Sequence, residues 1–104
     1  MLLRGKSVEA LTTSAEHFVA LTRSHQALVC LFFTAEWCEH CKRFAAVMNR
    51  PGVMFYRVDV DRMQGLRDLY RVGELPTFAL VRDGVHIASL TDTCDLLGQL
   101  APFL

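Results

Sequence analysis

The sequence predicts an α/β protein with a central mixed β-sheet flanked by helices. The apolar run from Ala27 to Phe33 shows no alternation of polar and apolar positions, which is typical of a strand buried on both faces. Segments with helical spacing of apolar residues alternate with strand-like segments along most of the chain. Near the end, Asp83-Gly84 separates two apolar segments, and this dipeptide is a hairpin signal. The predicted order is therefore βαβαββα, with parallel pairing early and an antiparallel hairpin late.

Length and composition restrict the class of protein. A chain of 104 residues, of which 52% are hydrophobic, suits one compact domain at 1–104 with a packed core. Eleven basic and eleven acidic residues cancel, so nothing predicts attraction to nucleic acid or to a membrane surface. Met1 to Lys6 lacks the apolar region of a signal peptide, and no apolar run approaches the ~20 residues of a membrane span. These features predict a cytoplasmic protein whose cysteines are not structural staples.

Local signals define the elements in chain order. Thr13 and Glu16 have the spacing of a capping box, which starts a helix at Ser14. Pro51-Gly52 ends the second helical pattern. The expected elements are a strand at 8–11, a helix at 14–23, a strand at 27–33, a helix from about 38 to before 51, a strand at 53–60, a helix at 63–70, strands at 77–81 and 85–88, and a last helix from about Asp92.

Two cysteines, Cys38 and Cys41, lie where the central strand meets the following helix. This spacing closes a small disulfide ring or supplies two ligands to a metal, and a βαβ context favours the redox interpretation. The first turn of a helix stabilises a thiolate, so we expect the pKa of Cys38 to fall below the ~8.5 of a free cysteine. A metal site needs more ligands, and His40 is the one candidate in this segment.

The other two cysteines have different surroundings. Cys30 lies in the middle of the central strand, where we expect it to act as a small hydrophobic residue. Cys94 lies near the start of the last expected helix, where it is either an exposed, oxidisable thiol or an inert one. Asp92 and Asp95 beside it favour inertness, because nearby carboxylates raise the pKa of a thiol.

The segment from Trp37 to Lys42, together with Leu75-Pro76-Thr77-Phe78, resembles the thioredoxin family. The resemblance runs from Val8 to the last helix and includes the Val-Asp-Val-Asp stretch at 58–61. A Cys-x-x-Cys pair combined with a distant x-Pro-Thr is much more specific than the cysteine pair alone. The resemblance implies the thioredoxin fold.

The resemblance also implies a function: a thiol–disulfide oxidoreductase that reduces protein disulfides without an organic cofactor or a metal. By this resemblance Cys38 is the attacking thiol and Cys41 the resolving thiol. Leu75–Pro76 is implied to be a cis peptide facing them, and Trp37 and Leu75 to line the groove that receives the disulfide. The implied partners are disulfide-containing proteins and a separate reductase or small thiol that supplies electrons.

Several residues depart from the family pattern. Glu39-His40 replaces the usual Gly-Pro between the cysteines and is expected to modulate the site. A histidine before the second cysteine is similar to the disulfide isomerases and oxidases. Phe32 stands where many thioredoxins carry a buried aspartate, Ala46 stands where they carry a proline, and the segment after Cys41 is shorter. Two alternatives therefore stay open: a higher-potential oxidase or isomerase, and a thioredoxin-like binding module whose dithiol is idle.

Overall fold

The structure, a computed structural model, describes residues 8–91 and 93–104. Its elements are β1 (Val8–Leu11), α1 (Ser14–Arg23), β2 (Leu28–Thr34), α2 (Glu39–Lys42), the 3₁₀ turn η1 (Ala45–Val47), β3 (Val53–Asp59), α3 (Gln64–Leu69), β4 (Thr77–Arg82), β5 (Val85–Thr91), α4 (Leu96–Leu100) and the 3₁₀ turn η2 (Ala101–Phe103). This is the predicted βαβαββα order. The predictions made for Met1 to Lys6 and for Asp92 fall outside the described residues.

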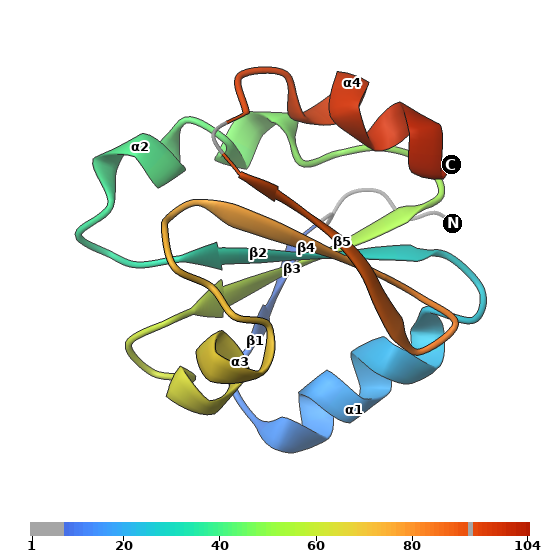
Figure 1. Ribbon diagram of the computed structural model, residues 1–104, viewed down its shortest axis with the longest axis horizontal. Coiled ribbons are helices and arrows are strands. Elements are labelled where there is room, and N and C mark those ends of the chain that lie inside the picture. The colour runs from blue at the N-terminus through green and yellow to red at the C-terminus, as the bar shows by residue number, and fades with distance from the viewer. Residues whose placement is uncertain (1–7, 92) are drawn as a thin grey trace.

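The five strands form one mixed sheet in the order β1-β3-β2-β4-β5. β3 pairs in parallel with β1 and β2, whereas β4 runs antiparallel to both β2 and β5. Helices α1 and α3 cover one face of the sheet, and α2 and α4 lie over the other (Figure 1). The result is an α/β sandwich with the central mixed sheet that the sequence predicts.

The core is built on β2, whose residues from Leu28 to Phe33 are all buried. Neighbouring phenylalanines face opposite sides of the sheet. Phe33 packs against Tyr70 on the α1 and α3 side, while Phe32 packs against Phe78 on the α2 and α4 side. Burial of each such ring stabilises the fold by about 1.5–3 kcal/mol, so this central strand fixes the position of both layers.

The predicted capping box starts α1. The Thr13 hydroxyl accepts a hydrogen bond from the Glu16 amide at 3.1 Å, and the Glu16 carboxylate accepts one from the Thr13 amide at 3.2 Å. Such caps contribute about 1 kcal/mol. Hydrogen bonds from Thr12 and Thr13 also hold the pKa of Glu16 below its ordinary value. The helix spans Ser14–Arg23, as predicted.

The second helix is much shorter than predicted, because regular α-helix ends at Lys42 and only η1 follows. The chain from 39 to 52 has to run back along the whole of β2, about 23 Å at ~3.3 Å per residue, and then descend to the sheet. An α-helix advances only about 1.5 Å per residue. A 3₁₀ turn and an irregular stretch at 48–52 advance faster and cover the distance.

The last helix also differs from the prediction. β5 continues to Thr91, and α4 begins at Leu96. Asp95 sets this start, because its carboxylate accepts a hydrogen bond from the Gly98 amide at 3.1 Å. Among the described residues, no helix is both long enough and apolar enough to cross a bilayer.

Candidate active site

Three connections meet at the carboxyl end of β2. In the sheet register, Thr34 lies opposite Asp59 of β3, and Phe33 lies opposite Thr77 of β4. The segments that follow β2 and β3 and the segment that precedes β4 therefore come together at one edge, where α2 also starts (Figure 1). This arrangement brings the Cys-x-x-Cys segment near Leu75–Pro76, although the two are far apart in the sequence.

The structure joins Cys38 and Cys41 in a disulfide, with a Cα–Cα distance of 5.4 Å. Cys38 is the N-cap of α2, and its sulfur accepts a hydrogen bond from the Cys41 amide at 3.2 Å. The exposed fraction is 6% for Cys38 and 1% for Cys41. Because α2 has only four residues, its dipole is small. The Cys41 amide, rather than a long helix, is therefore the backbone group that stabilises negative charge on Cys38.

An aromatic floor lies between this segment and the sheet; we define it as Phe32, Phe44 and Phe78. Phe32 stacks on Phe78 with ring centroids 5.1 Å apart, and Phe44 meets Phe78 edge to face, also at 5.1 Å. All three residues are at most 4% exposed. The floor carries no group that accepts a proton. Cys38 and Cys41 belong to the same buried cluster as these three rings, so the side of the dithiol that faces the sheet is apolar.

The residues between the cysteines form the opposite, polar side. Glu39 and His40 are exposed, and the Glu39 carboxylate pairs with Lys42 at 2.8 Å. The Arg43 guanidinium donates to Nδ1 of His40 across 3.4 Å. His40 also lies edge-on to the ring of Phe44, with centroids 5.8 Å apart. Sequence reasoning did not single out Arg43, which adds a permanent positive charge to this side.

Trp37 is 66% exposed beside the disulfide. Its indole nitrogen donates a hydrogen bond to the Asp61 carboxylate at 2.8 Å, which fixes the ring at the end of β3. Sequence analysis did not predict this hydrogen bond between Trp37 and Asp61, although Asp61 belongs to the Val-Asp-Val-Asp stretch. Leu75 is half-buried, Pro76 is buried, and the peptide bond between them is cis, as the resemblance implied.

The two remaining cysteines are free. Cys30 is fully buried, and burial raises the pKa of its thiol far above the ordinary value, which makes it inert at neutral pH. Cys94 is exposed. Within residues 8–91 and 93–104, no three His, Cys, Asp or Glu side chains come together as metal ligands would.

The fold and the disulfide together define the class: this is a Cys-x-x-Cys protein of the thioredoxin fold. A family model described as Thioredoxin matches residues 9–100. The chain belongs to the thioredoxin family.

Individual relatives agree with this assignment. The chain is 34% identical over 82 residues to thioredoxin from the sponge Geodia cydonium, covering 74% of this chain and 77% of that protein. It is 35% identical over 73 residues to an H-type thioredoxin from rice, Oryza sativa subsp. indica, covering 64% of this chain. That alignment spans 60% of the rice protein, less than two thirds of its length.

Solved structures show the same architecture. The crystal structure of a wild-type poplar thioredoxin h superimposes with a TM-score of 0.83 at 25% identity, covering 94% of this chain and 96% of that one. Thioredoxin from Nicotiana alata superimposes with a TM-score of 0.82 at 22% identity, covering 98% and 96%. The second likeness is one of fold.

Proposed function

We propose that the protein is a thiol–disulfide oxidoreductase that reduces disulfides in other proteins through Cys38 and Cys41. The observation that carries the proposal is the disulfide itself, at the end of the central strand and at the N-cap of α2. One thiol that attacks the partner's disulfide and a second thiol beside it that resolves the mixed disulfide are the two parts that thiol–disulfide exchange needs.

The proposed reaction has two steps. The Cys38 thiolate attacks one sulfur of the substrate disulfide, which forms a mixed disulfide and releases the other substrate sulfur as a thiolate. The Cys41 thiol loses its proton and attacks the Cys38 sulfur. The internal disulfide then reforms, and the second substrate sulfur leaves. The substrate gains two electrons, and the protein dithiol loses them.

The residues around Cys38 are proposed to receive the substrate. Trp37 offers an exposed indole held by Asp61, and Leu75 and Pro76 precede β4 at the same edge of the sheet. A partner chain bound against these residues would bring its disulfide to Cys38. Such contacts are apolar and depend little on the partner's sequence.

The proposed partners are disulfide-containing proteins together with a separate electron donor, either a reductase or a small thiol. The chemistry takes place between sulfur atoms and requires no organic cofactor or metal.

A cytoplasmic location is part of the proposal. The free thiols of Cys30 and Cys94 support it, because unpaired cysteines persist in reducing compartments.

A second candidate function is that of an oxidase or isomerase with a higher potential. His40, exposed between the cysteines, and Arg43 beside it favour this candidate. Positive charge near the dithiol stabilises the Cys38 thiolate and therefore the reduced form, which makes the disulfide more oxidising.

A turnover assay tests the proposed function. The protein is mixed with a disulfide-containing protein substrate and dithiothreitol, and substrate reduction is compared with the uncatalysed rate. We expect clear acceleration by the wild type and none by a Cys38→Ser/Cys41→Ser double variant. Equal rates for the two proteins would favour the idle binding module. The reduction potential then separates reductase from oxidase.

A further inference from the structure

A pocket of about 430 Å³ lies between the α2 and η1 segment and the start of α4. His40, which lies between the two cysteines in the sequence, lines one end of it. The pocket therefore reaches the Cys-x-x-Cys segment at His40. Its size falls in the range of about 300–1,000 Å³ typical of small-molecule sites.

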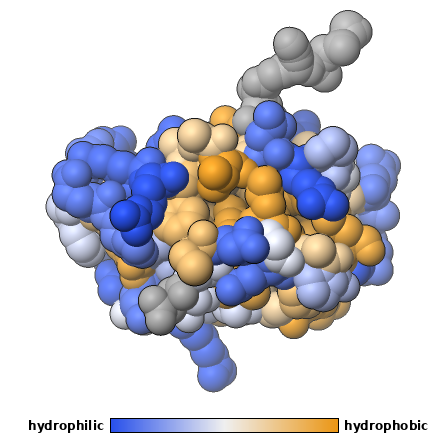
Figure 2. All heavy atoms as spheres, turned by 90° about the horizontal axis from the view of Figure 1, so that it is seen from above, coloured by the Kyte–Doolittle hydropathy of each residue, from blue (hydrophilic) through white to orange (hydrophobic). Residues whose placement is uncertain are grey.

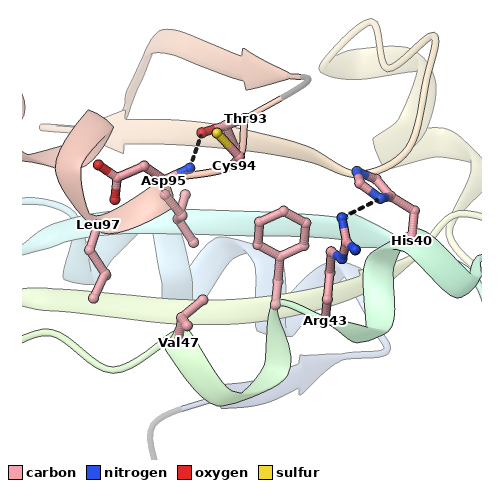
Figure 3. A pocket seen from close by; sticks show the side chains of 9 residues that line it. His40, Arg43, Val47, Thr93, Cys94, Asp95 and Leu97 are labelled. Atoms are coloured by element: carbon pink, nitrogen blue, oxygen red, sulfur yellow. Dashed lines mark hydrogen bonds between the residues drawn. The ribbon is translucent and has the colours of Figure 1, made fainter.

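The two ends of this pocket carry opposite charges. Figure 3 shows His40 and Arg43 together at one end and Asp95 and Leu97 at the other. The Arg43 guanidinium is a permanent cation, and its one described partner is the imidazole of His40. The Asp95 carboxylate caps α4 through the Gly98 amide and keeps further acceptor capacity. A ligand with both an anionic and a cationic group would find a counter-charge at each end.

The middle of the pocket is apolar. Phe44 and Val47 contribute to its lining. In Figure 2, which looks onto the side of α2 and α4, hydrophobic surface gathers between hydrophilic groups. An apolar centre with charged ends suits a short, folded molecule with polar termini, and it suits a uniformly charged ligand such as phosphate poorly.

We propose that this pocket binds a small zwitterionic thiol of about tripeptide size, and that this thiol is the electron donor for the Cys38–Cys41 disulfide. This inference rests on the proposed function and specifies the electron donor that the function requires. In the bound state the donor's carboxylate faces Arg43, its ammonium group faces Asp95, and its sulfur is delivered past His40 to the dithiol.

The proposed step balances with two donor molecules. The first donor thiolate attacks the sulfur of Cys38, which forms a mixed disulfide and releases Cys41 as a thiolate that takes up a proton. A second donor thiolate attacks the donor's sulfur in that mixed disulfide. Cys38 leaves as a thiolate, and the two donor molecules are joined in a disulfide. The protein disulfide gains two electrons, and the donors lose them.

Cys94 allows binding to be measured without turnover. In the oxidised protein, Cys38 and Cys41 are joined and Cys30 is buried, which leaves Cys94 as the exposed thiol. Cys94 also lines the pocket. A redox-inert ligand that occupies the pocket should therefore slow alkylation of this one cysteine.

The first experiment measures iodoacetamide alkylation of the oxidised protein with and without S-methylglutathione, a probe that has no free thiol. We expect saturating probe to slow alkylation of Cys94 at least five-fold. Arg43→Glu should abolish this protection, and the milder Arg43→Met should weaken it. Lys42→Glu is the matched control with the same charge change; Lys42 lines a separate hollow and should leave protection intact. Absence of protection in the wild type would overturn the proposal.

The second experiment compares two reductants of the Cys38–Cys41 disulfide, glutathione and the uncharged monothiol 2-mercaptoethanol. The ratio of the two rates cancels general effects on thiol reactivity. Arg43→Glu should lower the ratio at least ten-fold, and Lys42→Glu should leave it within two-fold. Equal ratios in wild type and Arg43→Glu would contradict the proposal and indicate a protein reductase as donor. If dithiothreitol reduces the Cys38–Cys41 disulfide but the protein reduces no protein substrate, the proposed function itself would be contradicted.

Discussion

The two sides of the Cys38–Cys41 disulfide differ sharply in their chemistry. On the outer side, Glu39 and His40 are exposed and interact with charged neighbours. On the inner side, the aromatic floor is closed and nonpolar. The outer side therefore supplies access and charge, while the inner side supplies stability and excludes water.

This difference changes how protons move during the reaction. Many thioredoxins carry a buried carboxylate beneath the site, and this carboxylate helps to receive the proton of the resolving thiol. Here Phe32 occupies that position, and an aromatic ring accepts no proton. The rings of the floor therefore offer no acceptor for a proton that leaves Cys41. Attack by Cys38 and resolution by Cys41 should consequently respond differently to pH and to mutation.

Removal of either sulfur should have the largest effect, because the proposed reaction needs both thiols and gives each a different role. Cys38→Ser should eliminate disulfide reduction, since the attacking thiol is removed. Cys41→Ser should still attack but accumulate as a mixed disulfide. Trapping in cell extract followed by mass spectrometry measures both outcomes. Faster alkylation of Cys41 than of Cys38 in the reduced protein at neutral pH would reverse the assignment.

A matched pair of aromatic truncations compares the floor with the outer side. Phe78→Ala should lower the free energy of unfolding by about 3–5 kcal/mol, because it leaves a cavity between Phe32 and Phe44. Trp37→Ala should cost no more than about 1 kcal/mol, because the ring is exposed and loses one surface hydrogen bond. Urea denaturation of both variants provides the measurement. Equal losses would show that the floor does not stabilise the site as described.

The charge on the outer side should tune the reduction potential by a smaller amount. We predict a potential above the roughly −270 mV quoted for thioredoxin, because the positive charge of Arg43, and of His40 when it is protonated, favours the Cys38 thiolate. His40→Pro should make the protein more reducing, on the order of 30 mV, or about tenfold in the equilibrium with glutathione. His40→Gln, which removes the charge without changing the backbone, is the control. A His40→Pro variant no more reducing than the wild type would refute this role of His40.

The elements that the sequence predicts best are those whose signals are local. The capping box of Thr13 and Glu16 specifies where α1 begins, and the unbroken apolar run specifies β2. The short Cys-x-x-Cys motif favoured the disulfide over a metal site, and the resemblance to the thioredoxin family implied the cis Leu75–Pro76 bond. For the helix, the strand and the cysteine pair, the decisive residues lie within a few positions of one another.

The features that sequence reasoning missed depend on distant parts of the chain. The length of α2 depends on the length of β2, because the crossover has to span that strand. The hydrogen bond from Trp37 to Asp61 joins residues 24 positions apart. Arg43 and Cys94 are also distant in the sequence, yet they line the same pocket. No local pattern encodes these contacts, so they became visible only once the fold was known.

The rate at which a mixed disulfide on Cys38 resolves tests whether the lack of a proton acceptor in the aromatic floor slows the reaction. A preformed mixed disulfide is mixed rapidly into buffers from mildly acidic to alkaline pH, and its decay is followed by stopped flow in the wild type and in Phe32→Asp. Because only the thiolate of Cys41 attacks, we predict slow decay at neutral pH that rises about tenfold per pH unit below the pKa of that thiol. Phe32→Asp should decay faster at neutral pH, since its carboxylate accepts the proton. Fast, pH-independent decay in the wild type would show that another group already performs this role.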